Sequence, residues 1–231
     1  EKLYRSAENI FYRVFDYNGE EMNPKYFYVE EYLDSYRLDP RYYSNFYTEL
    51  YRLIHKNFDD VKWQELRELA EIKKANKPDI SAKQKVKYFL LADLDPNFSI
   101  IKKTREDFYS NLSNRMRYIV RSGELVTAKG GSATGTKGHA TALITEKFDG
   151  LVTTDALYNL VPRRINPYYL LFLFKQPIIL NQVNMFTKGT LYKLIQRNDF
   201  EKIKIPRLES SLEEQIVDKM MNYLSVLQNK F

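Results

Sequence analysis

The sequence contains no cysteine and only two histidines, His55 and His139, among its 231 residues. The absence of thiols excludes disulfides and thiolate metal sites, and it fits a reducing compartment. With only two histidines, we do not expect a histidine-based metal site or a catalytic triad. We therefore expect no metal and no cofactor.

Long apolar runs are also missing. The longest, Tyr168 to Phe174, has seven residues, whereas a membrane-spanning helix needs roughly 20. Residues 1–9 lack the apolar stretch of a signal peptide. We therefore expect a cytoplasmic protein with no membrane role. Because the sequence begins with glutamate, it can be a full subunit or a fragment of a longer protein.

Positive charge is concentrated in the middle of the chain, which has a net charge of +6. Residues 1–80 carry 13 basic and 16 acidic residues, and residues 208–231 carry 2 and 4. Residues 81–207 carry 21 basic and 10 acidic residues, a net +11. Such a basic block favours a polyanionic partner such as nucleic acid. A basic domain that binds no anion is the alternative.

Hydrophobic patterning predicts both helices and strands. A helix is predicted for residues 43–54, a short one within 61–70 and a buried one for 167–175, while 178–185 fits a helix or a strand. Strands are predicted at 70–73, 86–91, 115–120, 125–128, 140–144, 151–154, 157–161 and 203–206.

The last residues predict a long helix. Ser211 followed by Glu214 fits a capping box at its start. Apolar residues then recur at alternating spacings of four and three, as in a seam that pairs with another helix. These seam residues are Leu212, Ile216, Met220, Tyr223 and Leu227. The seam fits a helix of a second copy or packing on the chain's own domain, and the two are not exclusive.

Residues 129–139 form a glycine-rich loop between two predicted strands. The loop nearly matches a phosphate-binding P-loop, but Thr136 separates the last glycine from Lys137, and Gly138 replaces the required hydroxyl. Glycine permits close approach of the backbone to DNA, and hydroxyls and lysines reach phosphates or base edges. A mobile surface loop is the alternative. The DNA-contact candidates here are Lys129, Ser132, Thr134, Thr136, Lys137, His139 and Thr141.

Further DNA-contact candidates lie on predicted strands and turns outside this loop. Arg115 and Arg117 share one face of a predicted strand. Arginine can hold a phosphate or read guanine with two hydrogen bonds, although such arginines can also line a solvated sheet face. The full set is Arg115, Arg117, Arg121, Arg163, Arg164, Lys188 and Thr190.

Two short patterns resemble catalytic motifs. Residues 95–98 (Asp-Pro-Asn-Phe) are similar to the Asn/Asp-Pro-Pro-aromatic motif of amino-methyltransferases, but the second proline is missing, so we interpret them as a turn. Asp60, Glu71 and Lys73 have the spacing of a metal-dependent nuclease core, which charged sequences often contain by chance. Such a core also requires carboxylates that converge on Mg²⁺. We predict no catalytic residues.

Several motifs follow one another in a defined order after Tyr118. They are 120–126 with its Gly-Glu turn, 150–154 (Gly-Leu-Val-Thr-Thr), 166–170 (Asn-Pro-Tyr-Tyr-Leu), 188–190 (Lys-Gly-Thr), and 200–206 followed by 213–216 (Glu-Glu-Gln-Ile). In this order they resemble the target recognition domain of the type I restriction-modification specificity subunit family. Residues 37–43 resemble the segment that often precedes such domains. Arg207 departs from the family, which often has a second proline there, and residues 1–36 match no motif.

The resemblance implies an α+β fold with a mixed β-sheet. It also implies a bacterial, non-catalytic subunit that binds one half of a bipartite double-stranded DNA site. It implies a methyltransferase subunit as partner, with a motor-nuclease subunit in some complexes, and a long helix that pairs with a second helix. The second recognition domain would come from a homodimer or from a longer chain.

The predicted organisation has four parts. They are an unassigned aromatic-rich segment (1–36), a helical lead-in (37–80), the recognition domain (81–207) and the spacer or pairing helix (208–231). Two alternatives remain: the specificity portion of a single-chain endonuclease-methyltransferase, and a protein-interaction module without DNA binding.

Overall fold

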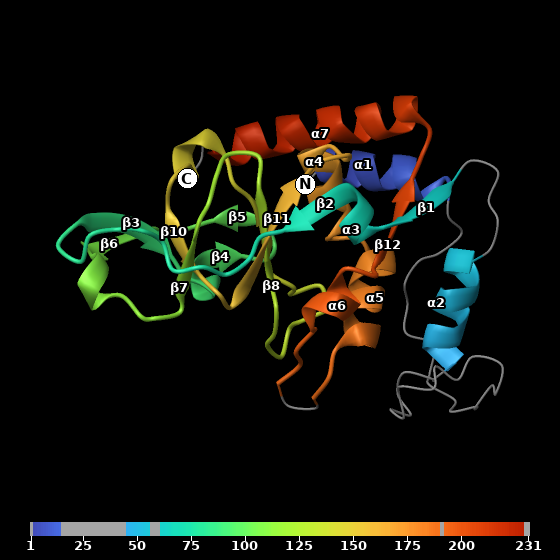
Figure 1. Ribbon diagram of the computed structural model, residues 1–231. Coiled ribbons are helices and arrows are strands. Elements are labelled where there is room, and N and C mark those ends of the chain that lie inside the picture. Colours follow the sequence, from blue (N-terminus) through green and yellow to red (C-terminus); the bar gives the residue numbers. More distant parts are fainter. Residues whose placement is uncertain (1, 15–44, 56–60, 190–191, 229–231) are drawn as a thin grey trace.

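The computed structural model describes residues 2–14, 45–55, 61–189 and 192–228 (Figure 1). The segment 37–43, Asp60 and Thr190, which the sequence analysis singled out, lie outside these residues, as does most of 1–36.

Two four-stranded sheets form the strand-rich half of the protein. The first is antiparallel throughout, in the order β2 (Ala70–Ile72), β11 (Leu157–Pro162), β8 (Leu125–Ala128) and β9 (Thr141–Leu143). The second has the order β6 (Arg105–Phe108), β3 (Lys85–Phe89), β10 (Val152–Thr154) and β7 (Met116–Ile119). Within it β3 and β10 run parallel, whereas the other neighbours are antiparallel. The predicted α+β class with a mixed sheet is therefore confirmed.

Two pairs of short strands complete the β structure. They are β4 (Leu94–Asp95) with β5 (Ile100–Ile101), and β1 (Lys62–Glu65) with β12 (Lys204–Arg207). Pro206 lies within β12 opposite Trp63. Because β12 pairs with β1 alone, the missing N–H of proline interrupts no second ladder.

Helices cover the other half of the protein. They are α1 (Lys2–Tyr12), α2 (Asn45–His55), α3 (Leu66–Leu69), α4 (Pro167–Leu173), α5 (Pro177–Phe186), α6 (Arg197–Phe200) and α7 (Ser210–Gln228), with 3₁₀ turns η2 (Leu91–Asp93), η3 (Tyr109–Asn111) and η4 (Glu146–Phe148). The Asn166 side chain caps α4 by accepting the Tyr168 N–H at 2.9 Å, and Pro167 opens the helix where proline is tolerated. No helix in the described part of the chain is both long and apolar enough to span a membrane.

The start of the final helix differs from its prediction. The helix begins at Ser210, and Ser211 bonds Glu209 instead of capping. Glu213, not Glu214, holds the preceding backbone, because its Oε1 accepts the Leu208 N–H at 3.0 Å. Glu213 also pairs with Arg207 at 2.8 Å, which fixes the angle at which α7 leaves β12.

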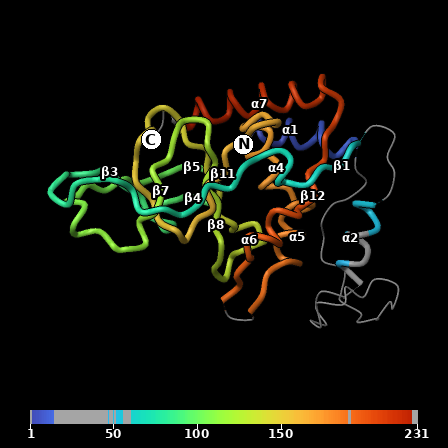
Figure 2. Tube along the Cα trace, in the orientation of Figure 1, coloured from blue at the N-terminus to red at the C-terminus, as the bar shows by residue number. Residues whose placement is uncertain are grey.

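The seam of α7 packs on the chain's own helices. Ile216, Met220, Tyr223 and Leu227 are buried in one core with α1 and α4, and Leu212 packs against it. The Tyr4 ring of α1 lies 5.7 Å from Tyr223 and 5.9 Å from Phe172 of α4. Figure 2 shows α1 and α4 running beneath α7. The chain itself therefore supplies a helical partner for α7.

The sheets include strands that lie before residue 81. The sequence places residues 61–80 in a helical lead-in, but β1 pairs with β12, and β2 joins the sheet of β11. The helix predicted within 61–70 is reduced to α3, because Lys62–Glu65 forms a strand first. We therefore move the proposed start of the recognition domain from residue 81 to residue 61.

Candidate nucleic-acid interface

The glycine-rich loop 129–139 connects β8 to β9 and is anchored at both ends. Near its start, the Gly131 N–H donates to the Lys193 carbonyl at 2.8 Å. Near its end, Lys175 Nζ donates to the carbonyls of Lys137 (3.4 Å) and His139 (3.5 Å). The alternative of a loosely attached surface loop therefore does not fit these contacts.

Gly135 sets the path of the loop in its middle. Its φ is +71°, and a Cβ on it would lie 2.5 Å from the backbone nitrogen of Asn184 in α5. No side chain fits at such an approach, and the left-handed conformation also favours glycine. The loop is thus pressed against α5 at a position that only glycine can occupy without a shift.

The candidate residues of this loop fall into two groups. Ser132, Thr136 and Lys137 are exposed, and Lys129 is partly exposed. Thr134, His139 and Thr141 are buried. The expectation that His139 faces DNA or solvent is wrong, and none of these three buried side chains is placed to contact DNA directly.

His139 instead supports the loop from inside. Its Nδ1 accepts the Gly135 N–H at 3.3 Å, so Nε2 carries the proton and donates to Thr127 Oγ1 at 2.8 Å. Thr127 in turn bonds Thr141 Oγ1 at 2.8 Å. Complete burial, with a smaller contribution from the Lys175 cation, lowers the pKa of His139 to about 3. The imidazole is therefore neutral near pH 7.

Lys129 lies over two aromatic rings where the two large sheets meet. Its Nζ is 4.8 Å from the centre of the Tyr158 ring and 5.9 Å from that of Tyr118. Burial lowers the pKa of the amine. Beside it, Arg115 donates to Asp155 at 2.8 Å. A lysine held by ring faces keeps its charge available to an anion more readily than one paired with a carboxylate.

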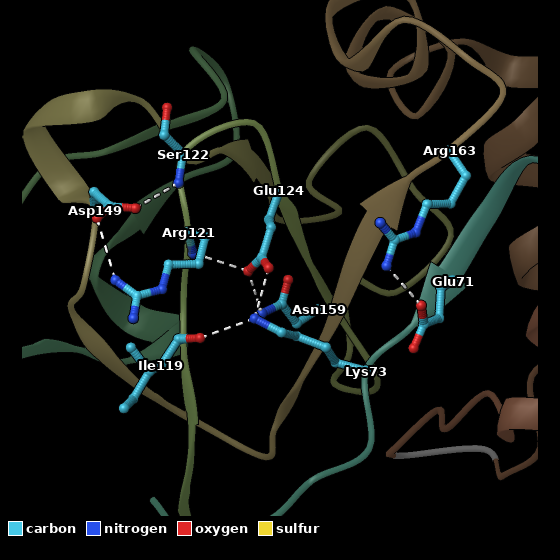
Figure 3. Close-up of polar contacts among 9 residues, drawn as sticks. All are labelled: Glu71, Lys73, Ile119, Arg121, Ser122, Glu124, Asp149, Asn159 and Arg163. Atoms are coloured by element: carbon cyan, nitrogen blue, oxygen red, sulfur yellow. Dashed lines mark hydrogen bonds and ion pairs between the residues drawn. The ribbon is translucent and has the colours of Figure 1, made fainter.

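Two of the four other arginine candidates are paired with carboxylates. Arg121 contacts Asp149 at 3.3 Å, and Arg163 contacts Glu71 at 2.9 Å (Figure 3). Arg117 is partly exposed on β7, and Arg164 is exposed. Exposed ion pairs contribute about 0–1 kcal/mol each, so a phosphate can compete for these arginines, but at the cost of breaking the pair.

A buried carboxylate joins the turn before β8 to two other strands. Glu124 accepts hydrogen bonds from Lys73 Nζ (2.6 Å), Asn159 Nδ2 (2.8 Å) and the Arg121 N–H (2.9 Å). Lys73 also donates to the Ile119 carbonyl at 3.0 Å. The acidic residue of the Gly-Glu turn motif is therefore part of the scaffold.

The same network shows that the nuclease-like spacing forms no common site. In Figure 3, Lys73 points toward Glu124, while Glu71 points away toward Arg163. The turn expected at residues 95–98 is confirmed, because Asp95 Oδ1 accepts the N–H groups of Asn97 (2.9 Å) and Phe98 (3.3 Å). Among the described residues, no group of three acidic or histidine side chains is placed to hold a metal ion.

A second loop lies beside the glycine-rich one. Lys188 and Leu194 form a bridge, and Leu194 also bridges to Gly130. Tyr192 and Leu194 on this loop are exposed, and the sequence analysis did not select them. The sequence contained a signal for them, because large apolar residues on both sides of Lys193 follow the glycine turn at 188–190.

Comparison with known proteins gives matches in structure only. No protein-family model and no curated protein matches the sequence. The HsdS subunit of Thermoanaerobacter tengcongensis matches with a TM-score of 0.57 and 20% identity over 76% of this chain. A chain from a study of complex assembly and conformational transition in the type I R-M system matches with a TM-score of 0.60 and 21% identity, again over 76%.

This chain spans 45% of the first of these neighbours and 44% of the second. At identities of 20–21%, these matches show a shared fold. The resemblance read from the ordered motifs is therefore confirmed at that level: the chain has the fold of the HsdS specificity subunits of type I restriction-modification systems.

Proposed function

We propose that this chain is the DNA-reading part of a specificity subunit in a type I restriction-modification system. It binds one half of a bipartite double-stranded DNA site and directs adenine methylation and DNA cleavage by partner subunits in the cytoplasm. It performs no chemistry itself. The observation that carries the proposal is the fold shared with HsdS subunits.

We call loop 129–139 and the neighbouring residues 188–189 and 192–194 the loop side. The charge and geometry of this side support DNA as the ligand. The exposed residues Ser132, Thr136 and Lys137 stand on a loop that is held by backbone and buried side-chain contacts. Lys129 begins the glycine-rich loop, and Lys188 begins the neighbouring loop. Backbone contacts of Leu194 and Ile195 join the two loops. A preorganised loop with hydroxyls and cations can contact base edges and phosphates with little ordering cost.

The helical half supports a role in assembly. Together α1 and α7 form a packed pair, which we assign as the spacer and as the docking surface for the methyltransferase subunit. Because the chain spans less than half of its structural neighbours, a complete bipartite site requires a second recognition domain, from another copy or from further sequence.

DNA binding measured against salt tests the proposal. Duplexes would be selected from a randomised pool with the wild-type chain, and their affinity measured by fluorescence anisotropy. We expect the affinity to fall steeply between roughly 50 and 200 mM salt, because phosphate contacts release counterions. A flat affinity over this range, or no selected duplex, would refute the proposal.

A charge-matched pair of variants gives the control. Lys137→Glu should weaken DNA binding and lower the salt slope by about one. Lys2→Glu, an equal change of charge on an exposed residue of α1, should leave the slope nearly unchanged. Normal methylation by a reconstituted complex that carries Lys137→Glu would instead favour a protein-interaction module.

A further inference from the structure

The loop that carries Tyr192 and Leu194 is closed at its base by backbone hydrogen bonds. Lys188 and Leu194 exchange two of them, at 2.8 and 2.9 Å. Gly189 has a φ of +93°, and a Cβ on it would lie 2.4 Å from the Tyr192 carbonyl oxygen. The returning strand is tied to the glycine-rich loop, because the Ile195 N–H donates to the Lys129 carbonyl at 3.0 Å. In Figure 1 the described segments on either side of residues 190–191 extend below α6.

Two large apolar side chains are exposed on this anchored loop. Tyr192 is 63% exposed and Leu194 is 43% exposed, and Tyr192 is the most exposed large hydrophobic residue in the described part of the chain. Both lie against Gly130: a Cβ there would be 3.0 Å from Tyr192 Cε1 and 3.1 Å from Leu194 Cδ1. The two side chains therefore pack over the buried Gly130 and form one small apolar patch.

Two lysines and one serine lie close to this patch in the chain. Lys188 lies at the base of the loop, with Asp199 3.8 Å away. Lys193 follows Tyr192 directly, and its Nζ bonds Asn184 Oδ1 at 2.9 Å. Exposed Ser132 stands two residues after Gly130. A flat apolar ring set among lysines matches the faces of nucleobases and the phosphates that flank them.

We propose that Tyr192 and Leu194 form an apolar wedge that enters the base stack of double-stranded DNA and partly unstacks one base step, while the neighbouring lysines hold the adjacent phosphates. Apolar side chains inserted in this way bend the duplex and bring more of it against the protein. The inference rests on the DNA-binding function proposed above and adds the residues that deform the DNA.

The test uses duplexes selected by the wild-type chain. Affinity is measured by anisotropy, bending by energy transfer between labelled duplex ends, and unstacking by 2-aminopurine placed at successive positions. We expect a bend and one fluorescent step with the wild type. Tyr192→Ala should lose affinity on the order of tenfold and lose the fluorescent step. The salt slope should not change, because no phosphate contact is removed.

Three further variants complete the test. Tyr192→Phe keeps the ring and should behave as the wild type. Leu194→Ala should reduce the bend. Phe108→Ala is the matched control, because Phe108 is 43% exposed with Lys85 Nζ 5.5 Å from its ring centre, but lies on β6 in the other sheet. This control should bind and bend DNA as the wild type does.

The outcomes separate the wedge from the function on which it depends. If the wild type binds DNA, and Tyr192→Ala and Leu194→Ala match it in affinity, bending and fluorescence, the wedge is refuted and the proposed function stands. If Tyr192→Ala weakens only the association with a methyltransferase subunit, the patch is a protein contact and the wedge is again refuted. If the wild type binds no duplex, both proposals fail.

Discussion

The turn side of this protein, which we define by Lys73, Arg121, Glu124 and Arg163, and the loop side both carry cationic residues, but the two sides neutralise them differently. On the turn side, Arg121 and Arg163 meet the carboxylates of Asp149 and Glu71, and Lys73 meets buried Glu124. On the loop side, Lys129 lies over tyrosine rings, and Lys188 lies 3.8 Å from Asp199. The first arrangement ties strands together, whereas ring faces leave the charge of Lys129 for a ligand. A count of lysines and arginines along the sequence cannot separate these two situations.

The largest effect should come from the buried carboxylate of the turn side. Glu124→Ala would leave Lys73 and Asn159 without their shared acceptor, and breaking such a buried pair costs about 3 kcal/mol. We expect this loss in the free energy of unfolding, measured by urea denaturation. A cost below about 0.5 kcal/mol, the level of an exposed pair, would show that the network does not stabilise the sheets.

A smaller effect should appear in DNA binding, on the loop side. Lys129→Gln removes a cation held by rings, and we expect about tenfold weaker binding at fixed salt, a change of about 1.4 kcal/mol. Arg163→Gln removes an equal charge from the turn side and should have less effect, because Glu71 already neutralises that arginine. Equal losses in the two variants would contradict the comparison.

Acid should weaken the loop side through His139. The folded-state pKa is about 3, below the unfolded value of about 6.5. The unfolded chain therefore takes up a proton at a higher pH than the folded chain. The stabilisation is complete above about pH 6.5 and is lost as the pH falls toward 3, by at most about 1.4 kcal/mol per pH unit. The pH dependence can be measured from the urea unfolding midpoints of the wild type and His139→Asn between pH 7 and 5. If the midpoints of the two proteins fall equally with pH, His139 does not cause the loss of stability.

The smallest effect should come from the exposed pairs of the turn side. Glu71→Gln breaks the contact with Arg163, and an exposed pair of this kind contributes about 0–1 kcal/mol. We expect the unfolding free energy to change by less than about 0.5 kcal/mol. In DNA binding, the freed Arg163 should give equal or slightly tighter affinity. A clear loss of affinity would mean that Glu71 itself positions a DNA contact.

Much of the fold could be predicted because its elements are short apolar runs between strong turn signals. The strands β3, β7 to β11 and β12, and the helices α4 and α7, lie within a few residues of their predicted ranges. The sequence did not predict the contacts between segments that are distant along the chain. Nothing local in residues 70–73 reveals that they pair with β11, and nothing in residues 2–12 reveals that they pack on α7.

The candidate site shows the same limit at the scale of single side chains. His139 stands among glycine, lysine and threonine, a composition typical of an exposed loop. Its burial follows from the close approach of Gly135 to α5, which depends on a helix that begins 42 residues later, at Pro177. Tyr192 and Leu194 show the converse, because residues that pattern as core are held outside by a closed loop.

The separation of buried and exposed residues within the glycine-rich loop has an evolutionary consequence. Gly135 and His139 fix the course of the backbone from inside, and Thr136 Oγ1 donates to the Ala133 carbonyl, whereas the side chains of Ser132 and Lys137 are exposed. Exposed substitutions of this kind usually change the unfolding free energy by less than about 0.5 kcal/mol. Mutation can therefore sample new side chains at the two outward positions while the frame that presents them stays intact. For the DNA-binding function proposed above, substitutions at these two positions would change the contacts to DNA without unfolding the loop.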